Sequence, residues 1–270
     1  MRTVAVVPAY NEEATVAAVL DRLYPLVDEL VVVDDGSTDR TRAEVQGWLP
    51  GHDRAALLSF VRNRGMSAAY YTALGEVRRR FQAGELDGDD LVLTVDADGQ
   101  HDLTALGELC RLTVDEGLDA LLARRDLSDY PPYKQFGNWV VSAWASLWAG
   151  HRLLDVESGY RVFRVAAIAD ALDYYRGWRY SETVEVAVVL CRRGYRVRND
   201  VLVPVPVFRS RTRLSDALVD LAVIPRAAWG VRRARRRRTS PRRPASRGAG
   251  RDALAASPAP SAPPGSGGGR

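Results

Sequence analysis

The sequence predicts an α/β fold in which a mostly parallel central sheet carries helices on both faces. Short β-branched apolar runs recur through the first half of the chain, and segments with helical spacing lie between them. These strand-like runs are apolar at almost every position, which is typical of strands that are buried on both sides. Strands that alternate with helices in this way usually form a parallel sheet, because each helix connects one strand to the next.

Strands are expected at 4–7, 30–33, 57–61, 91–95 and 119–123. Apolar residues three and four positions apart predict helices between them, as at Val16, Val19, Leu20 and Leu23 and again across 68–77. Beyond residue 124 the rhythm changes, and we expect a Trp-rich helix at 133–150, a strand at 159–164 and a helix at 182–193. Residues 201–207 include Pro204 and Pro206, which predicts an edge strand or an extended loop.

The C-terminal part of the chain differs in composition. Residues 214–238 predict an amphipathic helix that ends in a run of arginines, whereas 239–270 are rich in Pro, Gly, Ser and Ala without periodicity. Such a composition predicts a disordered tail. We therefore expect one folded domain over residues 1–213, followed by the helix and the tail. The chain has 270 residues, of which 46% are hydrophobic, and this is enough to bury a full core.

Charge and short motifs exclude several classes of protein. The net charge of +4 is segregated, because residues 226–270 hold twelve arginines against Asp252 and leave −7 on residues 1–225. An acidic body with a basic tail does not support a nucleic-acid partner for the protein as a whole. Gln135 follows Lys134, the only lysine, so there is no GxxxxGK[ST] loop, and no GxGxxG occurs; P-loop NTPases and typical Rossmann dehydrogenases are excluded.

Cysteine usage and hydropathy bear on the compartment. Cys110 and Cys191 lie far apart in apolar segments, which excludes a disulfide framework and a CxxC site and fits a reducing compartment. Neither a stretch of about 18 to 20 apolar residues nor a secretory signal is present. We expect a cytoplasmic protein, with attachment to the cytoplasmic face of a membrane as the alternative.

Polar clusters follow each of the first four predicted strands, at 8–12, 34–39, 62–65 and 96–101. Open α/β sheets bind ligands at the carboxyl ends of their strands, so these clusters are expected to form one site. Any one of them alone would be explained by turn or helix-cap residues. Four in succession at the same edge favour a binding site.

The most informative cluster contains Asp96 and Asp98. Side chains two residues apart in extended backbone point to the same side, so these carboxylates and Gln100 can converge on one point. Paired carboxylates repel each other unless a cation lies between them, and Mg²⁺ or Mn²⁺ typically takes one or two carboxylates together with phosphate oxygens. The alternative is a loop whose Asp102 and Thr104 simply cap the next helix. Asp34 and Asp35 could accept hydrogen bonds from a ribose or a base, which completes a nucleotide-diphosphate pocket.

These residues resemble glycosyltransferase family 2 with its GT-A fold, and within it the dolichyl-phosphate mannose synthase and polyprenyl-phosphate glycosyltransferase branch. The similar stretches are 7–13, 33–39, 63–65, 96–101 and 155–161, with weaker similarity as far as Arg211. The resemblance implies donor binding by Pro8, Tyr10, Glu12, Asp34, Asp35 and Asp96. It implies a metal held by Asp96, Asp98 and Gln100, catalytic roles for Asp98, Arg161 and Arg211, and phosphate contacts from Lys134, Ser158 and Arg161.

The resemblance also implies a reaction, in which a sugar moves with inversion from GDP-mannose or a UDP-hexose to a polyprenyl or dolichyl phosphate. A phosphate acceptor needs no general base, whereas a hydroxyl acceptor would need a carboxylate, for which Glu182 and Glu185 are the candidates. An inactive GT-A scaffold is a further alternative, and the intact Asp96 and Asp98 give it no support. At 211–216 the chain lacks the Gly and Lys that many relatives have, so closure over the acceptor is expected to differ.

Two helical segments raise the question of a membrane. Trp144 and Trp148 are four residues apart and therefore lie on one face of the predicted helix. Two tryptophans on one face suit either core packing or the boundary between membrane and water, and we favour core packing. In the segment 214–238, an apolar stripe lies opposite Asp216 and Asp220 and is made of Leu214, Leu218, Leu221 and Pro225. Such a stripe with a cationic end could lie on an anionic bilayer. The alternative is a helix that closes the sheet and ends in a solvated arginine run.

Overall fold

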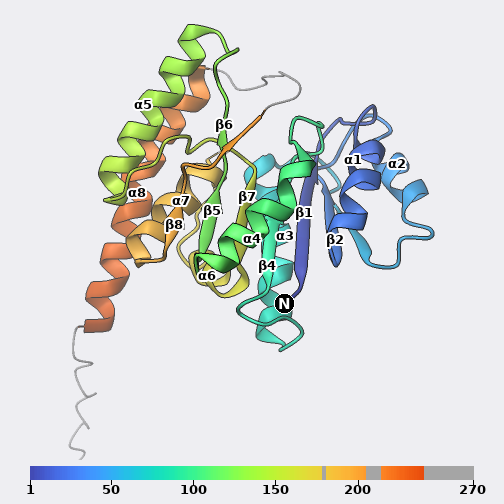
Figure 1. The fold of residues 1–270 in the computed structure, drawn as a ribbon, viewed down its shortest axis with the longest axis horizontal. Helices are drawn as coiled ribbons and strands as arrows, with labels where there is room; N and C mark the ends of the chain where they lie inside the picture. Colours follow the sequence, from blue (N-terminus) through green and yellow to red (C-terminus); the bar gives the residue numbers. More distant parts are fainter. Residues whose placement is uncertain (178–180, 205–213, 240–270) are drawn as a thin grey trace, which may run out of the picture.

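The computed structural model describes residues 1–177, 181–204 and 214–239. Its main sheet has seven strands in the order β3-β2-β1-β4-β7-β5-β8 (Figure 1). The strands are β1 (Thr3–Ala9), β2 (Glu29–Asp34), β3 (Ala55–Ser59), β4 (Leu91–Thr94), β5 (Ala120–Leu122), β7 (Arg161–Arg164) and β8 (Val197–Arg198). A separate parallel pair joins β6 (Arg124–Arg125) to β9 (Leu202–Val203).

One strand runs against the others. β7 pairs antiparallel with β4 and β5, and Arg161 lies opposite Thr94 and Leu122. The other pairs in the sheet are parallel. β7 therefore begins at the edge where β1, β2 and β4 end, and the loop that precedes it joins the loops that follow those strands.

Helices cover both faces of the sheet, as the apolar strands predict. In β1, Val4 and Val6 belong to one hydrophobic cluster and Ala5 and Val7 to the other. The first cluster includes residues from α3 (Met66–Gln82), α5 (Pro132–Ala149), α6 (Val165–Ala171), α7 (Glu182–Arg193) and α8 (Leu214–Thr239). The second includes residues from α1 (Val16–Leu23), α2 (Thr41–Trp48) and α4 (Leu106–Asp115), and the short 3₁₀ turns η1 (Tyr24–Leu26) and η2 (Leu103–Ala105) complete the described elements.

The predicted strands and helices agree with this architecture, and one expectation at the C-terminal end, the apolar stripe of α8, needs correction. Of the expected 201–207 segment, β9 covers Leu202–Val203, and 205–213 lies outside the described residues. The predicted stripe of α8 is wrong in its phase, because Asp220, expected on the polar side, is only 5% exposed. Among the α8 side chains that the structure describes, at 219–233, the buried apolar ones are instead Val223, Ile224, Ala227, Ala228 and Val231. The side chains of Leu214 and Leu218 lie outside the described ones.

This change of face in α8 has a packing cause. The small side chains of Ala227 and Ala228 face the core, and Trp144 of α5 donates its indole N–H to the carbonyl of Leu221 at 3.0 Å. α8 thus packs into the same hydrophobic cluster as α5 and α7. This packing agrees with the alternative in which the helix 214–238 closes the fold. The tail 239–270 predicted to be disordered lies, apart from Thr239, outside the described residues.

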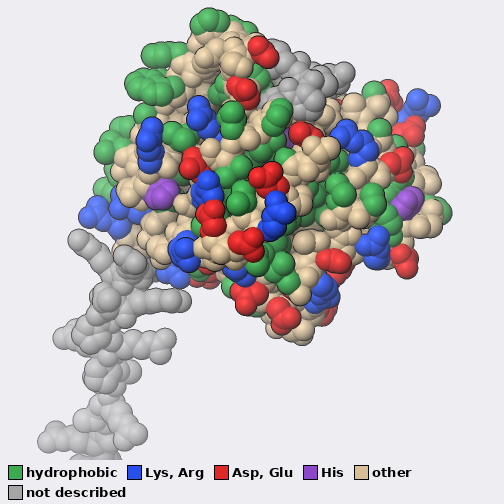
Figure 2. All heavy atoms as spheres, viewed as in Figure 1, with side chains coloured by type: hydrophobic (Ala, Val, Ile, Leu, Met, Phe, Trp, Pro, Cys, Tyr) green, Lys and Arg blue, Asp and Glu red, His purple; other side chains and the backbone are tan. Residues whose placement is uncertain are grey.

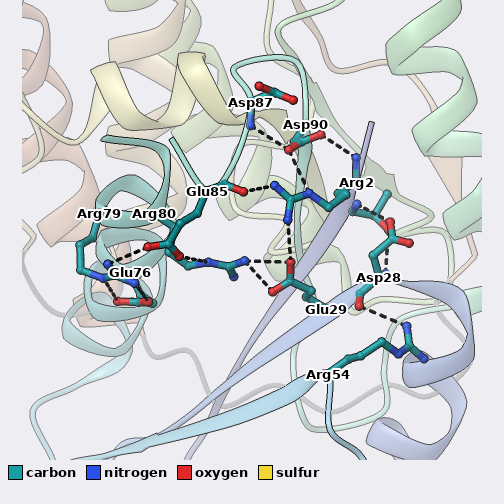
Figure 3. Close-up of polar contacts among 11 residues, drawn as sticks. Arg2, Asp28, Glu29, Arg54, Glu76, Arg79, Arg80, Glu85, Asp87 and Asp90 are labelled. Carbon is teal, nitrogen blue, oxygen red and sulfur yellow. Dashed lines mark hydrogen bonds and ion pairs between the residues drawn. The ribbon is translucent and has the colours of Figure 1, made fainter. Parts of the chain in front are cut away.

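The amino ends of the central strands are joined by charged side chains. The backbone N–H of Arg2 donates to Asp90 at 2.6 Å, and Arg80 of α3 pairs with Glu29 of β2 at 2.7 Å (Figure 3). Asp90 is 1% exposed and also accepts from the N–H of Asp87. These contacts pair charges at the edge of the sheet opposite to the polar loops described next.

Candidate active site

The four polar loops predicted from the sequence lie together at the carboxyl edge of the sheet. The N–H of Thr38, after β2, donates to the side chain of Asn11, after β1, at 2.9 Å. The hydroxyl of Thr15 donates to the carbonyl of Ala97 at 2.8 Å, which joins the β1 loop to the β4 loop. The N–H of Arg64, after β3, donates to Asp35 at 2.7 Å. Hydrogen bonds therefore connect all four loops.

Asp34 and Asp35 support this edge by binding protein groups. The Asp34 carboxylate is fully buried and accepts from the N–H of Ser37 at 3.1 Å and from the Arg42 guanidinium at 2.8 Å. Asp35, 2% exposed, accepts from the β3–α3 loop that includes Gly65; burial raises its pKa, and these backbone N–H groups oppose the rise. Both carboxylates organise the loops, and a contact from either to a nucleotide stays a prediction.

The loops approach each other closely at Gly36. Its φ is +65°, and a Cβ there would lie 2.3 Å from the backbone carbon of Arg62. Only glycine fits, because a side chain would meet backbone rather than a movable group. The turn after β2 and the loop after β3 are thereby held against each other. Of the other predicted donor residues, Pro8 is buried within β1, Glu12 is 8% exposed and Tyr10 is half-buried in the same loop.

The Asp96 carboxylate is held from several sides. The phenol of Tyr70, on α3, donates to one oxygen at 2.9 Å, and Nε2 of His101 lies 3.4 Å from the other. Nδ1 of His101 accepts the backbone N–H of Asp96 at 3.2 Å, which leaves the ring proton on Nε2 and directed toward that carboxylate. The His101 ring stacks on Tyr160 with 4.6 Å between centroids. Tyr70 and His101 therefore set the orientation of Asp96.

Asp98, two residues after Asp96 in the turn that follows β4, is half-buried. Burial raises the pKa of Asp98, and the neighbouring charge of Asp96 raises it further. Gln100 donates its backbone N–H to Asp98 at 3.0 Å and its side-chain amide to the other carboxylate oxygen. The predicted third ligand, Gln100, thus contacts Asp98 in this structure.

The donor set at Asp96 and Asp98 fits a hard divalent cation. A cation beside the pair would stabilise the ionised form of Asp98, which burial and the charge of Asp96 disfavour, and oxygen is the ligand atom that Mg²⁺ and Mn²⁺ take. Within the ranges that the structure describes, no group of three or more His, Cys, Asp or Glu side chains could hold a metal. Gln100 and phosphate oxygens of a bound substrate stay the predicted further ligands.

The loop before β7 closes the other side of the pair. A Cβ on Gly159 would lie 2.8 Å from an Asp96 carboxylate oxygen, and the carbonyl of Gly159 accepts from Thr94 at the end of β4. Glycine at 159 is required because the backbone passes directly against Asp96. The loop before β7, which belongs to the stretch 155–161 that resembles the polyprenyl-phosphate branch, thus borders Asp96.

Arg161 and Ser158, predicted to contact phosphate, are buried at 2% and 0% exposure. The Arg161 guanidinium donates to the carbonyls of Ser158, Val156 and Thr183 at 2.6, 2.6 and 2.5 Å. Burial lowers the pKa of Arg161 to about 10. In this structure both side chains are bonded within the protein, where Arg161 joins the loop to the start of α7; a phosphate contact by either stays a prediction. The sequence could not show this, since a buried and a ligand-binding arginine look alike.

The loop from β6 to α5 forms a further border. Arg125 makes a bidentate pair with Asp155 at 2.8 Å, and Asp155 is 1% exposed. Burial alone would raise the pKa of Asp155, but the Arg125 guanidinium outweighs it and the pKa is lowered. Burial raises the pKa of Tyr130; the charge of Arg125 opposes this rise, and the charges of Asp155 and Asp98 add to it. Lys134 follows on the first turn of α5 and is half-buried.

The two candidate bases differ in their surroundings. Glu185 is 1% exposed and accepts the backbone N–H groups of Arg176 and Gly177 at 2.8 and 3.0 Å, so it holds that loop. Glu182 is 8% exposed and accepts the hydroxyl of Ser67 at 2.7 Å. Burial raises the pKa of Glu182 to about 7, with a contribution from the charge of Asp96.

Glu182 also lines an apolar cavity behind the acidic pair, together with Tyr70, Gly159 and Arg161. Of the two glutamates, Glu182 is therefore the one near the site. Arg211, predicted to be catalytic, lies outside the described residues.

Comparison with known proteins decides the family. The model of glycosyl transferase family 2 matches residues 4–166, which include all four polar loops and the loop before β7. The chain belongs to glycosyltransferase family 2. Its fold is the GT-A fold of such enzymes, with the mostly parallel sheet and two-sided helical cover described above.

Relatives match along most of this glycosyltransferase. The undecaprenyl-phosphate mannosyltransferase of Micrococcus luteus is 26% identical over 239 residues, which cover 86% of this chain and 95% of that protein. The polyprenol monophosphomannose synthase of Mycolicibacterium smegmatis is 28% identical over 251 residues, 86% of this chain and 88% of that one. Glucosyl-3-phosphoglycerate synthase of Mycobacterium tuberculosis, solved with Mn²⁺, UDP-glucose and phosphoglyceric acid, shares the fold with a TM-score of 0.56 at 24% identity, covering 85% of this chain and 80% of that one.

Sequence reasoning missed several residues of this glycosyltransferase site. Tyr70 was not singled out, although it lies on the buried face of α3 between Ser67 and Leu74, where a phenol needs a polar partner. Arg125 and Tyr130 lie in 124–130, a polar stretch that follows a predicted strand just as the four clusters do but was not counted among them. Spacing alone could not pair Arg125 with Asp155, because their contact depends on the reversal of β7.

Proposed function

We propose that this glycosyltransferase moves a sugar, with inversion, from a nucleotide-diphosphate sugar to a polyprenyl phosphate. The observation that carries the proposal is the similarity to two transferases named for polyprenyl phosphate substrates, which extends over 86% of the chain and includes the paired-carboxylate site. Both names specify mannose, so GDP-mannose is the first donor to test, and a UDP-hexose is the second.

The acidic pair would serve the leaving group. Asp96 and Asp98 are the residues that would hold Mg²⁺ or Mn²⁺, which when bound neutralises the negative charge of the departing nucleoside diphosphate. Tyr70 and His101 keep the Asp96 carboxylate in one orientation, and Gly159 keeps the space beside it free. Pro8, Tyr10, Glu12, Asp34 and Asp35 remain the proposed donor-side residues, the two aspartates by shaping the loops.

The acceptor would supply its own nucleophile. An anionic oxygen of the lipid phosphate attacks the anomeric carbon, the new phosphate ester bond forms as the bond to the nucleoside diphosphate breaks, and the configuration inverts. A phosphate monoester is already anionic near neutral pH, so the protein contributes positioning rather than a base. Lys134, near the site border formed by Tyr130, is the described cation we propose for the lipid phosphate, and Arg211 is a second candidate outside the described residues.

A hydroxyl acceptor is the alternative, and one observation favours it. The raised pKa of Glu182, about 7, would let this carboxylate take a proton from an alcohol at neutral pH. Glu182 lines the cavity behind Asp96, whereas Glu185 is bound to backbone N–H groups elsewhere.

A radiolabelled transfer assay separates these functions. Purified full-length protein is incubated with GDP-mannose or UDP-glucose, with Mn²⁺ or with a chelator, and with undecaprenyl phosphate or a glycolipid alcohol. We expect label in an organic-soluble product that mild acid releases, with undecaprenyl phosphate and Mn²⁺ only. Asp98→Asn should abolish it, and Asp115→Asn on the exposed end of α4 is the matched control. An acid-stable product that disappears in Glu182→Gln would instead establish the hydroxyl acceptor, and no transfer with any acceptor would favour the inactive scaffold.

A further inference from the structure

One face of α5 is both exposed and apolar. Tyr133, Phe136, Trp139 and Leu147, here called the α5 face, are 63%, 65%, 63% and 68% exposed, and Ala143 between them is exposed as well. The helix contains a single charged residue, Lys134. Figure 2 shows hydrophobic side chains gathered over α5 on the surface of the molecule. A contiguous apolar surface of this kind marks an interaction site.

The opposite side of α5 is the one that belongs to the core. Val141, Ala145 and Ala149 are buried, and Trp144 and Trp148 pack against the same hydrophobic cluster. Core packing, the role favoured for those two tryptophans, is therefore confirmed. It leaves the α5 face without a role in the fold, since its aromatic side chains point away from the cluster that α5 helps to build.

The α5 face begins at the border of the active site. Tyr133 lies on the first turn of α5, and the side-chain amide of Asn138 on the same helix lies 2.9 Å from Asp155 and 3.0 Å from Glu157. Those two residues belong to the loop before β7, whose Gly159 lies against Asp96. From Tyr133 to Leu147 the helix extends about 21 Å at about 1.5 Å per residue. A substrate that lies along the α5 face would thus have one end beside the loop that borders the acidic pair.

The neighbouring helix adds positive charge. α8 packs beside α5, and in Figure 1 its C-terminal half continues past the end of α5. Arg226, Arg232 and Arg233 of α8 are exposed, as is Trp229 at 67%. Tyrosine and tryptophan favour the boundary between water and lipid, and arginine favours anionic headgroups. The combination suits a membrane surface better than a neutral apolar partner.

We propose that the α5 face docks on an anionic lipid bilayer, with α5 lying in the plane of the headgroups and the exposed arginines of α8 beside it. The inference rests on the proposed function, since a lipid-linked phosphate would then reach the acidic pair while its chain stays in the membrane. It differs from the sequence expectation, in which α8 supplied the apolar stripe. Among the described residues no helix is long and apolar enough to span a bilayer, so this contact is one of surface attachment.

Vesicle co-sedimentation of the full chain tests the docking. We compare wild type with Tyr133→Ser/Phe136→Ser/Trp139→Ser on vesicles of phosphatidylcholine with and without phosphatidylglycerol. We expect the triple variant to bind anionic vesicles about tenfold more weakly. Each of the three aromatic side chains would be partly buried in the bilayer, and serine in its place loses that favourable transfer from water. Leu26→Ser/Val61→Ser, at exposed apolar sites away from α5, is the matched control and should bind as wild type. Equal pelleting of wild type and triple variant overturns the proposal.

Two further measurements keep the result independent of folding and of the reaction. Bromine-labelled lipids should quench the fluorescence of wild type, and the conservative Trp139→Phe should lose part of that quenching while Trp48→Phe, at a buried site, should not. The triple variant should keep transfer to a short water-soluble polyprenyl phosphate and lose it with undecaprenyl phosphate in vesicles. No transfer to either acceptor by wild type would remove the proposed function but leave the vesicle result standing. Self-association of wild type that the triple variant abolishes, without vesicle binding, would assign the α5 face to a second copy and overturn the proposal.

Discussion

Tyr70→Phe tests whether the surroundings of Asp96 matter for the reaction. The substitution removes one hydroxyl, which donates to the Asp96 carboxylate at 2.9 Å, and keeps the ring, which is 4% exposed and packed in the core. Stability should change little, because the apolar volume stays the same. The carboxylate, in contrast, loses the donor that fixes its orientation.

The expected size of the effect follows from this geometry. Removing the hydrogen-bond partner of a metal-ligating side chain typically costs about 10- to 100-fold in metal affinity or activity. That corresponds to roughly 1.4 to 2.7 kcal/mol of binding free energy. His101, 3.4 Å from the other oxygen, still restrains Asp96, so we expect the lower half of that range.

The assay is a titration of Mn²⁺ followed by electron paramagnetic resonance, with GDP or UDP present, together with the transfer rate and the melting temperature. Tyr71→Phe is the matched control, because Tyr71 is the adjacent residue on α3 but stacks on Tyr175 at 5.5 Å. We expect weaker Mn²⁺ binding and slower transfer for Tyr70→Phe at an unchanged melting temperature. Wild-type Mn²⁺ affinity in Tyr70→Phe would refute the reasoning, as would an equal loss in both variants.

Three other predictions concern the same region. Gly159→Ala should abolish transfer and weaken Mn²⁺ binding, since its Cβ would lie 2.8 Å from Asp96; full activity in this variant would show that the loop can move away. For Glu182 the folded-state pKa of about 7 exceeds the ordinary 4.5, so its contribution to stability is present below pH 4.5 and lost as pH rises to about 7. Glu182→Gln should therefore reduce the fall in unfolding free energy between pH 5 and 8 by about 3 kcal/mol, measured by urea denaturation; identical pH profiles would contradict the burial argument. Asp155→Ala should cost about 2 kcal/mol or more in the same measurement, because the buried Asp155 accepts two charged hydrogen bonds and a backbone one from Arg125, and a loss under about 1 kcal/mol would mean that solvent replaces the carboxylate.

Much of the fold could be predicted because its signals are local. The apolar runs of β1, β2 and β4 and the helical spacing of α1 and α7 reflect burial of each element on both sides or on one face. The phase of α8 was predicted wrongly, because its buried face depends on α5 and α7 together. The spacing of apolar residues along the helix could not reveal that Asp220 is buried. Nor could it reveal that the backbone carbonyl of Leu221 accepts a hydrogen bond from Trp144.

The candidate site divides in a similar way. The convergence of four loops followed from the rule for parallel strands. Asp96 and Asp98 were predicted as a pair from the alternation of side chains in extended backbone, whereas the structure places Asp98 in a turn after β4. The roles of Arg161 and Ser158 were not predictable, since the same residue types suit a phosphate contact or a buried hydrogen-bonded position. Only burial, which depends on the whole packed structure, distinguishes the two.

What the sequence by itself determined is therefore the set of elements whose causes lie within a few residues, namely the strands, the amphipathic helices and the acidic pair after β4. The tertiary structure alone decided which side chains meet across the chain, such as Tyr70 with Asp96 and Arg125 with Asp155. It also decided that α5 turns an aromatic face outward. The physical reason is that periodicity encodes which residues avoid water, whereas the partner of a buried polar group depends on strand order and direction, above all on the antiparallel course of β7.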